Sequence, residues 1–600
     1  MSEPVPTPHL APASSPDNAR IARVLLETAR LLEIQGENRF KVQAYEKAAR
    51  EVASAPERVA DLAQAGRLGE LKGVGKGLAP KLEELARTGT MAQHQALLSA
   101  VPPGVLAMLE VPGLGPKRAK VLWAEHGVCD VESLDAACRD GRVAAFPGFG
   151  AALAKKLLEG IGTLAAQRAK RGGRARLDRA LATVRTLVGA LRACPDVVRA
   201  SEAGSARRRC ETVKDVDLVA SSAHPERVMD AFAALPGVVA VESRGPTKIT
   251  VALEGGLKAD LRVTDDSAFT TTLVHLTGSK AHNVRLRELA RTRGMKISEY
   301  AVERDGVALE IADEPAFFAA LGLAYVPPEL REDAGEVEAA AAGTIPHRLV
   351  EATDLAGALH NHTDWSDGSG TLLEMATAAR DRGWKYLAIT DHSRSSGYAG
   401  GLSPERLVEQ LAVIAGLNAS FAQDPDWRGF RLLTGSEVDI LPDGTLDYED
   451  ELLARLDVVV ASVHSRFQQP LEEMTARVKR AIANPLVGLL GHPTGRLLLE
   501  REPYALDVAD VVREAARVGC GIEINASPRR LELDWIHARL AASLGVAIAI
   551  NPDAHTTGQL AHVELGATVA RRAWLGPDQV LNTHPWEVVR ARLHARRHRA

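Results

Sequence analysis

The stretch LHNHTDWSDG, residues 359–368, begins with an apolar residue and then places histidines and aspartates close together, His360, His362 and Asp367 among them. Histidine and carboxylate side chains are costly to bury unless they are hydrogen-bonded or bind a cation. An apolar run that ends in such a cluster is typical of a buried strand whose last residues face a functional site. The stretch therefore predicts a strand end that presents metal ligands.

The same pattern recurs outward from this stretch, from about residue 356 to the C-terminal region. The runs are ALHNH (358–362), YLAITDH (386–392), FRLLTGSEVD (430–439), VVVASVH (458–464), VGLLGH (487–492), GIEINAS (521–527) and VAIAINPDAH (546–555). Helical stretches separate them. Strands that alternate with helices predict a (β/α) barrel, in which functional groups collect at the C-terminal ends of the strands.

The predicted strand ends carry a large set of candidate metal ligands. They are His360, His362, Asp367, His392, Glu437, His464, His492, Asp553 and His555. Any one of them alone is more often a hydrogen-bonded core residue than a ligand, but burying all of them together without cations would be prohibitive. The sequence therefore predicts a multinuclear metal site, and ligation rich in histidine suits Zn²⁺ or Mn²⁺ better than Mg²⁺ or Ca²⁺.

Length and composition bound the rest of the chain. At 600 residues it should hold several domains, and 46% hydrophobic and 25% charged residues are ordinary for a globular protein. The net charge of −4 leaves the partner open. Five scattered cysteines without CxxC spacing favour a reducing cytoplasm over a thiolate zinc site. No long apolar segment is present, so we expect a soluble protein without membrane contact and a disordered tail over residues 1–20.

One motif recurs in the N-terminal region, where the apolar spacing is helical from residue 21 to about residue 163. Its copies are LKGVGKGLAPKLEEL from Leu71, VPGLGPKRAKVLW from Val111 and FPGFGAALAKKLL from Phe146, with the glycine pairs Gly73/Gly75, Gly113/Gly115 and Gly148/Gly150. Glycines let the backbone approach a phosphate, and the helix that follows offers free N–H groups. A single copy could be a simple turn between helices. The recurrence favours the helix-hairpin-helix motif, which it resembles and which binds DNA backbone without reading sequence.

The stretch CETVKDVDLVA, residues 210–220, has two aspartates, Asp215 and Asp217, on the same face of a predicted strand. Alone, this pattern is most simply a solvated strand edge. Further on, KITVALEGGLKADLRV (248–263) predicts a β-hairpin that turns at Gly255 and Gly256 and carries Asp260 on its second arm. Three carboxylates that meet in this way can bind two divalent cations.

The C-terminal motifs closely resemble those of the PHP (polymerase and histidinol phosphatase) family, a distorted seven-stranded barrel with up to three metals. LHNHTDWSDG, ITDHS, GSEVD, SVHS, GHPTG and PDAH match its motifs in order. The resemblance implies one metal on His360, His362, Glu437 and Asp553, a second on Glu437, His464 and His492, and a third on Asp367, His392 and His555. Up to three Zn²⁺ or Mn²⁺ ions and phosphoester hydrolysis are thus implied.

The middle of the chain resembles the family X DNA polymerases. AGSARRR (203–209), continued through Glu211 to Asp217, is similar to their Gly-Ser-x-Arg-Arg and Asp-x-Asp motifs, and LTGSKAHNVRLRELARTRGMKISEY (276–300) is similar to their thumb. The resemblance implies that Asp215, Asp217 and Asp260 are catalytic and hold Mg²⁺ or Mn²⁺. It implies phosphate contacts from Gly204, Ser205 and Arg208, sugar contacts from Thr277 and Gly278, base reading by Asn283 and template contact by Arg287.

Two departures from the family pattern bear on the polymerase prediction. Lys214 stands where the family usually has glycine before its Asp-x-Asp, and an ammonium there could pair with a carboxylate and compete with the metal. His275 and Leu276 replace the usual aromatic pair before Thr277. These departures put sugar discrimination and polymerase efficiency in doubt, although the carboxylates are retained.

The N-terminal stretch ENRFKVQAYEKAAREVA, residues 37–53, resembles the lyase-like domain of DNA polymerase beta. The resemblance implies that Lys41 grips a 5′ phosphate and that Lys81 forms a Schiff base with deoxyribose phosphate. A simpler alternative is that Lys81 only binds phosphate, and the sequence leaves both open.

Together these patterns identify the chain as a member of the bacterial family X polymerases with a fused PHP domain. The predicted segments are a tail (1–20), a lyase-like helical domain (21–100), fingers (101–175), palm (176–265), thumb (266–335), linker (336–355) and PHP domain (356–600). We expect a monomer that uses dNTPs to fill gapped or nicked DNA and whose PHP domain is a 3′ to 5′ exonuclease, extending to abasic-site cleavage. An alternative is a nuclease whose degenerate palm only positions DNA, and a non-catalytic DNA scaffold is a more distant one.

Overall fold

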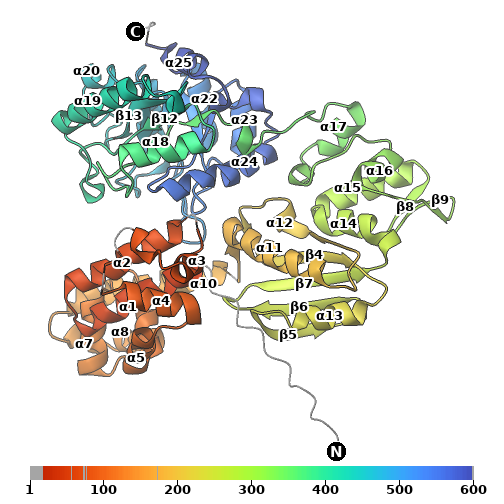
Figure 1. Ribbon diagram of the computed structural model, residues 1–600, viewed down its shortest axis with the longest axis horizontal. Coiled ribbons are helices and arrows are strands. Elements are labelled where there is room, and N and C mark those ends of the chain that lie inside the picture. Colours follow the sequence, from red (N-terminus) through yellow and green to blue (C-terminus); the bar gives the residue numbers. More distant parts are fainter. Residues whose placement is uncertain (1–17, 56, 72–73, 76, 172, 598–600) are drawn as a thin grey trace, which may run out of the picture. The chain divides into compact units, whose positions relative to one another are not determined.

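The computed structural model describes residues 18–55, 57–71, 74–75, 77–171 and 173–597. They form two compact units that join between Lys170 and Arg171, a few residues before the predicted boundary between fingers and palm (Figure 1). Residues 1–17 of the predicted tail, and Gly73 of the first glycine pair, lie outside the described residues. Within the described ranges, every helix is too short or too polar to span a bilayer.

The described residues of the first unit form helices joined by turns, without any strand, which confirms the prediction for this region. Its helices are α1 (Asn18–Gln35), α2 (Arg39–Ser54), α3 (Val59–Gln64), α4 (Ala79–Thr88), α5 (Ala92–Ala100), α6 (Pro103–Met108), α7 (Pro116–His126), α8 (Val131–Arg139), α9 (Arg142–Ala145) and α10 (Gly150–Arg171). Helices α4 and α7 carry proline in their first turn, where no N–H is needed, and end at Gly89 and Gly127 in the left-handed conformation. Their apolar faces share one core.

The palm forms a five-stranded sheet with the strand order β2-β4-β7-β6-β5. Its elements are β1 (Ala175–Arg176), α11 (Leu177–Ala193), β2 (Arg199–Glu202), α12 (Gly204–Arg207), β3 (Thr212–Val213), β4 (Asp215–Ser221), α13 (Pro225–Ala233), β5 (Val238–Arg244), β6 (Lys248–Leu253) and β7 (Lys258–Thr264). Helices α11 and α13 pack on one face, and buried residues alternate with more exposed ones along β6, in the first part of β7 and at the start of β4. The predicted hairpin is β6–β7 and turns at Gly255 and Gly256, both with positive φ.

The thumb follows the palm and has its own core. Its elements are α14 (Phe269–Thr277), α15 (Lys280–Thr292), β8 (Met295–Ile297), β9 (Val302–Arg304), β10 (Val307–Ala308) and α16 (Glu314–Ala320). The stretch predicted as a linker contains a further helix, α17 (Glu336–Ala342), whose Val337 and Ala340 pack into the thumb core. The connection to the C-terminal domain is therefore structured at its start.

The C-terminal domain has a seven-stranded, all-parallel sheet in sequential order, as the sequence predicts. The strands are β11 (Gly357–Ala358), β12 (Tyr386–Ile389), β13 (Arg431–Asp439), β14 (Val458–Ser462), β15 (Leu489–Leu490), β16 (Gly521–Asn525) and β17 (Ile548–Asn551). The first and last strands approach each other just beyond their ends, where Asn361 pairs with Ala554 in parallel and the His362 N–H donates to the Ala554 carbonyl at 2.8 Å. The sheet is thus a nearly closed barrel.

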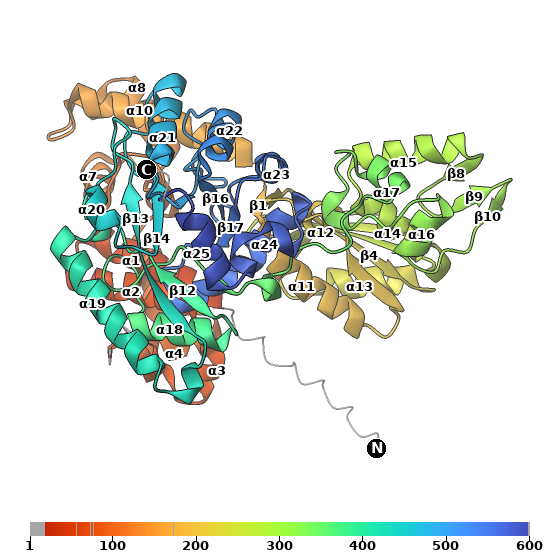
Figure 2. The ribbon, with the colours of Figure 1, turned by 90° about the horizontal axis from the view of Figure 1, so that it is seen from above.

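Helices surround this barrel, as Figure 2 shows for α18 and α19 outside β12 and β13. They are α18 (Leu372–Asp381), α19 (Pro404–Phe421), α20 (Asp450–Leu453), α21 (Leu471–Ala483), α22 (Val508–Val518), α23 (Trp535–Ser543), α24 (Val563–Arg572) and α25 (Trp586–His594). Every residue of β12, β14, β16 and β17 is buried because helices cover the outer face and side chains fill the inside. The predicted fold class is confirmed.

Candidate metal centres

The candidate ligands of the C-terminal domain lie together at the C-terminal ends of the barrel strands. His360 and His362 follow β11, His392 follows β12, Glu437 is in β13, His464 follows β14, His492 follows β15, and Asp553 and His555 follow β17. Asp367 reaches the same place from the loop after β11. Parallel strands in sequential order bring these distant stretches to one end of the barrel.

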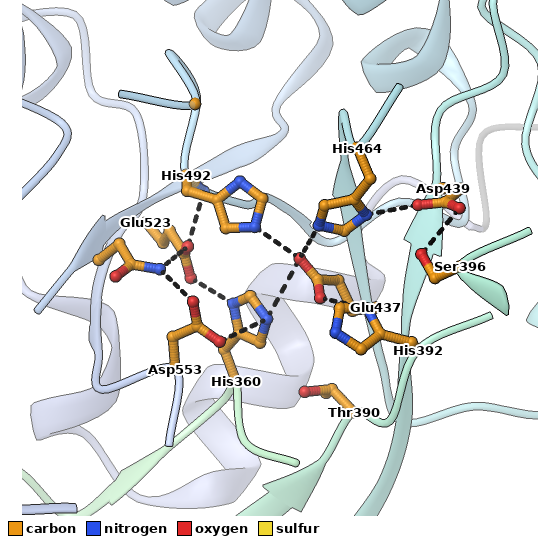
Figure 3. Close-up of polar contacts among 12 residues, drawn as sticks. His360, Thr390, His392, Ser396, Glu437, Asp439, His464, His492, Glu523 and Asp553 are labelled. Atoms are coloured by element: carbon orange, nitrogen blue, oxygen red, sulfur yellow. Dashed lines mark hydrogen bonds and ion pairs between the residues drawn. The ribbon is translucent and has the colours of Figure 1, made fainter. Parts of the chain in front are cut away.

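Glu437 lies at the centre of this cluster, with imidazoles pointing toward its carboxylate (Figure 3). Its Oε1 is 2.8 Å from Nε2 of His492, 3.3 Å from Nε2 of His464 and 3.4 Å from Nε2 of His360. Its Oε2 is 2.9 Å from Nδ1 of His392. Burial disfavours the charge, but the surrounding histidines hold the pKa of the Glu437 carboxyl well below its ordinary value. Both oxygens are therefore ionised acceptors at neutral pH.

Two further carboxylates extend the cluster toward the outside. The Oδ1 atom of Asp553 is 3.2 Å from Nε2 of His362 and 3.7 Å from Nε2 of His360. The Oδ1 atom of Asp367 is 3.3 Å from Nε2 of His555 and 3.9 Å from Nδ1 of His362. His362 therefore lies between the two carboxylates.

The donor set fits divalent metals. Nε2 of His360, both ring nitrogens of His362 and Oε1 of Glu437 are buried and have no hydrogen-bond partner within the described part of the chain. Such atoms are costly unless a ligand satisfies them. Three groups of potential ligand atoms lie within 4.8 Å of one another: His362, Asp367, His392 and His555; His360, His362 and Asp553; and His392, Glu437 and His464. His362 and His392 each belong to two groups, so the implied division of ligands among three metals stays a prediction.

Two buried carboxylates that the sequence analysis did not single out support the ligands. Glu523 in β16 is fully buried, lies 2.8 Å from Nδ1 of His360 and accepts the His492 N–H at 2.7 Å. Asp439 in β13 lies 2.5 Å from Nδ1 of His464 and accepts a hydrogen bond from Ser396. Carboxylates in this position fix the orientation of a ligating imidazole and raise its basicity. Their sequence signal was weak: Glu523 lies within the short strand GIEIN, and Asp439 ends a strand, RLLTGSEVD, that has several other polar residues.

Replacing Glu523 by glutamine should weaken metal retention by the barrel about 10- to 100-fold. The amide keeps the size of the side chain but loses the charge that holds the His360 ring. Metal content after dialysis against graded chelator concentrations would measure the effect. Glu472→Gln, the same change at an exposed position of α21, is the control. Equal metal content in both variants would contradict the supporting role of Glu523.

The palm carboxylates meet on the open face of its sheet. Asp217 of β4 lies directly beside Asp260 of the parallel strand β7, and Asp215 shares the face with Asp217. Burial, followed by the charges of Asp215 and Asp260, raises the pKa of Asp217 to about 7. A divalent cation between the three carboxylates would remove this cost, so the arrangement fits the predicted two-metal site.

Gly204 explains how the turn that is predicted to contact phosphate comes so close to these carboxylates. Its φ is +61°, and a Cβ built on it would lie 1.9 Å from Oδ2 of Asp217. Only glycine fits this position. The neighbouring Ala203 N–H donates to the Asp217 carbonyl at 2.8 Å, so α12, which contains Ser205, begins directly beside the carboxylates.

Arg207 and Arg208, which follow Ser205, tie the palm to the thumb. Arg207 donates to Oγ1 of the buried Thr277 at 2.8 Å and forms a two-pronged ion pair with Glu314. Arg208 donates to the Thr277 carbonyl at 2.8 Å and pairs with Glu332 at 3.0 Å. The guanidinium of Arg208 thus already has partners, and its phosphate contact stays a prediction.

The other predicted thumb residues gather around His275. Asn283 donates to the His275 carbonyl at 2.6 Å, and Nη2 of Arg287 is 3.4 Å from the His275 ring. Asn283 also packs against Gly278, where an added Cβ would lie 2.7 Å from its Oδ1. Leu276 instead packs against apolar side chains of the palm. The structure brings these residues to one place, while their roles toward nucleotide and template stay predictions.

The lysine that pairs with a palm carboxylate is Lys248, and not Lys214 as the sequence suggested. Lys214 is exposed, and the described residues include no ion pair for it. Lys214 lies in the bend between β3 and β4, just before Asp215. Lys248 of β6 occupies the expected place, with Nζ 2.5 Å from Oδ2 of Asp260.

The first unit places its predicted lysines on helices α2 and α4. Lys81 is half-buried and donates to Oε1 of Gln93 at 2.5 Å and to the Tyr45 hydroxyl at 3.3 Å, both neutral partners. Lys41 pairs with Glu37 at 2.8 Å on the exposed side of α2. Among the described residues, Lys81 has no carboxylate partner.

The described glycine motifs precede helices as predicted. Gly75 precedes α4, Gly113 and Gly115 precede α7, and Gly148 precedes α10, which begins at Gly150. Gly113 and Gly148 have φ of +91° and +82°, a conformation that favours glycine. Each turn therefore delivers the chain into a helix N-terminus, the geometry that suits a phosphate.

Comparison with known proteins places these sites in a family. Family models match a helix-hairpin-helix domain (residues 16–91), a SAM-like helix-hairpin-helix tandem (105–163), a DNA polymerase beta thumb (272–332) and a PHP domain (358–527). The Bacillus subtilis protein named DNA polymerase/3′-5′ exonuclease PolX is 38% identical over 95% of this chain and 98% of its own length. The chain belongs to the PolX family. Probable phosphatases from two Thermoanaerobacter strains are each 30% identical over 37% of this chain and 89% of their own lengths.

The family models together match the helix-hairpin-helix, thumb and PHP parts of this one chain. The matched thumb corresponds to α14 through the segment that contains Glu332, and the matched PHP domain begins at Ala358 in β11. The phosphatase relatives align with 37% of this chain and with 89% of their own lengths, so they resemble only a part of this chain. Membership in the family therefore rests on the whole chain, whereas the likeness to phosphatases concerns one part.

Proposed function

We propose that the chain is a DNA repair polymerase that fills short gaps and whose PHP domain hydrolyses DNA phosphodiesters from the 3′ end. The observation that carries the proposal is that one chain has two separate clusters of potential metal ligands. One is the group of three aspartates on the open face of the palm, and the other is the histidine-rich cluster at the end of the barrel. Abasic-site cleavage by the barrel is a further part of the proposal.

In the palm, Asp215, Asp217 and Asp260 would hold two Mg²⁺ or Mn²⁺ ions. Bound there, the ions would activate the primer 3′ hydroxyl and neutralise the incoming triphosphate. The turn at Gly204 and Ser205, together with Arg208, would contact the phosphates, which requires Arg208 to exchange Glu332 for the nucleotide.

The thumb would complete the nucleotide site. Thr277 and Gly278 would lie beside the sugar, Asn283 would contact the base and Arg287 the template. In support, Thr277 is fixed by Arg207, and Asn283 is fixed by the His275 carbonyl, so both are held in place before a nucleotide arrives.

In the barrel, the candidate ligands would hold up to three Zn²⁺ or Mn²⁺ ions. Clustered ions supply an activated water and stabilise both oxygens of a scissile phosphodiester. Glu523 and Asp439 hold the rings of His360 and His464, and therefore keep the cluster oriented for such a substrate.

The N-terminal unit would bind the DNA backbone through its described glycine turns and through Lys41, and a backbone contact by Gly73 belongs to the same proposal. Lys81 would act as a Schiff-base nucleophile or bind phosphate, and its neutral partners Gln93 and Tyr45 are compatible with both roles. Gapped or nicked DNA, dNTPs and a monomeric state belong to the proposal. A reducing cytoplasm does as well, because all five cysteines are free.

A single-nucleotide gapped duplex tests the proposal, with label on the primer and either Mg²⁺ or Mn²⁺ present. We expect extension of the primer when dNTPs are added and shortening when they are left out. Shortening without any extension would instead favour a nuclease whose palm only positions DNA. Light scattering at several protein concentrations would test the monomeric state.

A further inference from the structure

The open face of the palm sheet holds a cation at its carboxylates. Lys248 begins β6, the strand beside β7, and its Nζ lies 2.5 Å from Oδ2 of Asp260. The Lys248 side chain is 45% exposed and that of Asp260 is 22% exposed. One of the two carboxylate oxygens of Asp260 is thus paired with the Lys248 ammonium, and the Lys248 side chain is partly exposed to solvent.

The neighbouring cations of this face are paired elsewhere. Arg262, directly opposite Lys248 on β7, pairs with Glu299 at 3.1 Å. Lys258, two residues before Asp260 on the same strand, pairs with Glu242 at 2.6 Å. In the part of the chain that the structure describes, Lys248 is the lysine whose ion pair occupies a predicted ligand of the palm metals.

An ammonium and a divalent cation compete for the same carboxylate oxygen. Like charges about 4 Å apart repel, so a metal bound at Asp260 would push Lys248 away. The pair is partly exposed, which makes it weak and readily exchanged. Lysine suits such an exchange, because its stem is flexible and its ammonium binds any oxyanion within reach.

A DNA phosphate is the oxyanion that the proposed reaction would bring to this face. The primer end must reach Asp215, Asp217 and Asp260, so its backbone must pass the open side of β6 and β7. DNA also carries a high density of phosphate charge that attracts lysine. Lys248 projects from this face, whereas α11 and α13 cover the other.

We propose that Lys248 holds Asp260 in the metal-free palm and passes to a DNA backbone phosphate when DNA binds. This inference rests on the proposed polymerase function. DNA binding and metal binding at the palm then strengthen each other. A DNA phosphate that binds Lys248 frees Asp260 for the metal, and a metal that binds Asp260 frees Lys248 for the phosphate. Lys248 is then a positioning residue that keeps the metal site closed until DNA is present.

Mn²⁺ titration of the full-length protein, followed by electron paramagnetic resonance, tests the inference. The titration is done with and without a gapped duplex whose primer ends in a dideoxynucleotide with phosphorothioate linkages, so that it is neither extended nor shortened. The palm site is the part of the Mn²⁺ binding that Asp217→Asn removes. No dNTP is present, so the readout is binding and not activity.

Without DNA, Lys248→Met should bind palm Mn²⁺ about two- to fivefold more tightly than the wild type, the range expected for losing a partly exposed ion pair. DNA should strengthen Mn²⁺ binding in the wild type and do so less in Lys248→Met. Lys258→Met, the same change on the neighbouring strand, and Lys248→Arg, which keeps the charge, should both behave as the wild type does.

The outcomes separate the two ideas. If Asp217→Asn removes no Mn²⁺ site, the proposed palm metal site itself is wrong. If it does remove a site, but Lys248→Met and Lys258→Met have equal Mn²⁺ affinity with and without DNA, the role of Lys248 is overturned and the palm site stands.

Discussion

Replacing Asp217 by alanine should lower template-directed primer extension by about 1,000-fold or more while leaving DNA shortening intact. The loss follows because Asp217 is the carboxylate that faces both Asp260 and the Gly204 turn, and bound metals contribute several kcal/mol to such reactions. Shortening is expected to survive because its candidate ligands all belong to the barrel, residues 360–555. Extension and shortening of the gapped duplex, scored in parallel, measure both effects.

The variant should not fail through misfolding. Burial and two neighbouring carboxylates raise the pKa of Asp217 to about 7, so the metal-free fold loses stability as the pH rises from the ordinary titration range of an aspartate to about 7, and this loss persists at higher pH. At pH 8, removing the carboxylate should leave the melting temperature equal or higher. Asp230→Ala, at a surface position of α13, is the matched control. Loss of both activities in Asp217→Ala, or full extension by it, would count against two independent sites.

The barrel and its ligands could be predicted from the sequence because their signals are local. Strands that are buried on both faces appear as continuous apolar runs, and β12, β14, β16 and β17 are buried at every position. Each run leads into histidine or carboxylate residues, and parallel strand order brings these residues together without any knowledge of the loops. The shared end of the barrel therefore follows from the pattern alone.

The supporting contacts could not be predicted, because they depend on which side chains meet across the fold. Glu523 and Asp439 look like ordinary members of their strands until β16 and β13 are placed beside His360 and His464. The palm shows the same limit. Lys214 is next to Asp215 in sequence but forms no ion pair among the described residues, whereas Lys248 is distant in sequence and reaches Asp260 from the adjacent strand.

The division of ligands among the barrel metals is a further matter that sequence order does not determine. His362 lies within reach of both Asp367 and Asp553, and His392 within reach of both Asp367 and Glu437. Motif spacing places each residue at a strand end but does not say which of two neighbouring carboxylates its ring faces. Rotamers and loop paths decide this, and both depend on packing.

Replacing Glu437 by glutamine should abolish DNA shortening, by about 1,000-fold or more, and leave primer extension unchanged. The two carboxylate oxygens of Glu437 lie within 3.4 Å of ring nitrogens of His492, His464, His360 and His392. A neutral amide at this central position removes the negative charge that would bind the metals, and the metals are needed for hydrolysis.

The assay for this variant is release of nucleotides from single-stranded DNA in Mn²⁺, together with the metal content of the purified protein, and both should fall together. Glu472→Gln again serves as the exposed control and should match the wild type. Because glutamine has nearly the size of glutamate, a normal unfolding transition with lost metal would place the defect at the site. Retained shortening by Glu437→Gln would mean that the nuclease does not depend on this cluster, and retained metal without activity would mean that Glu437 acts on the substrate and not as a ligand.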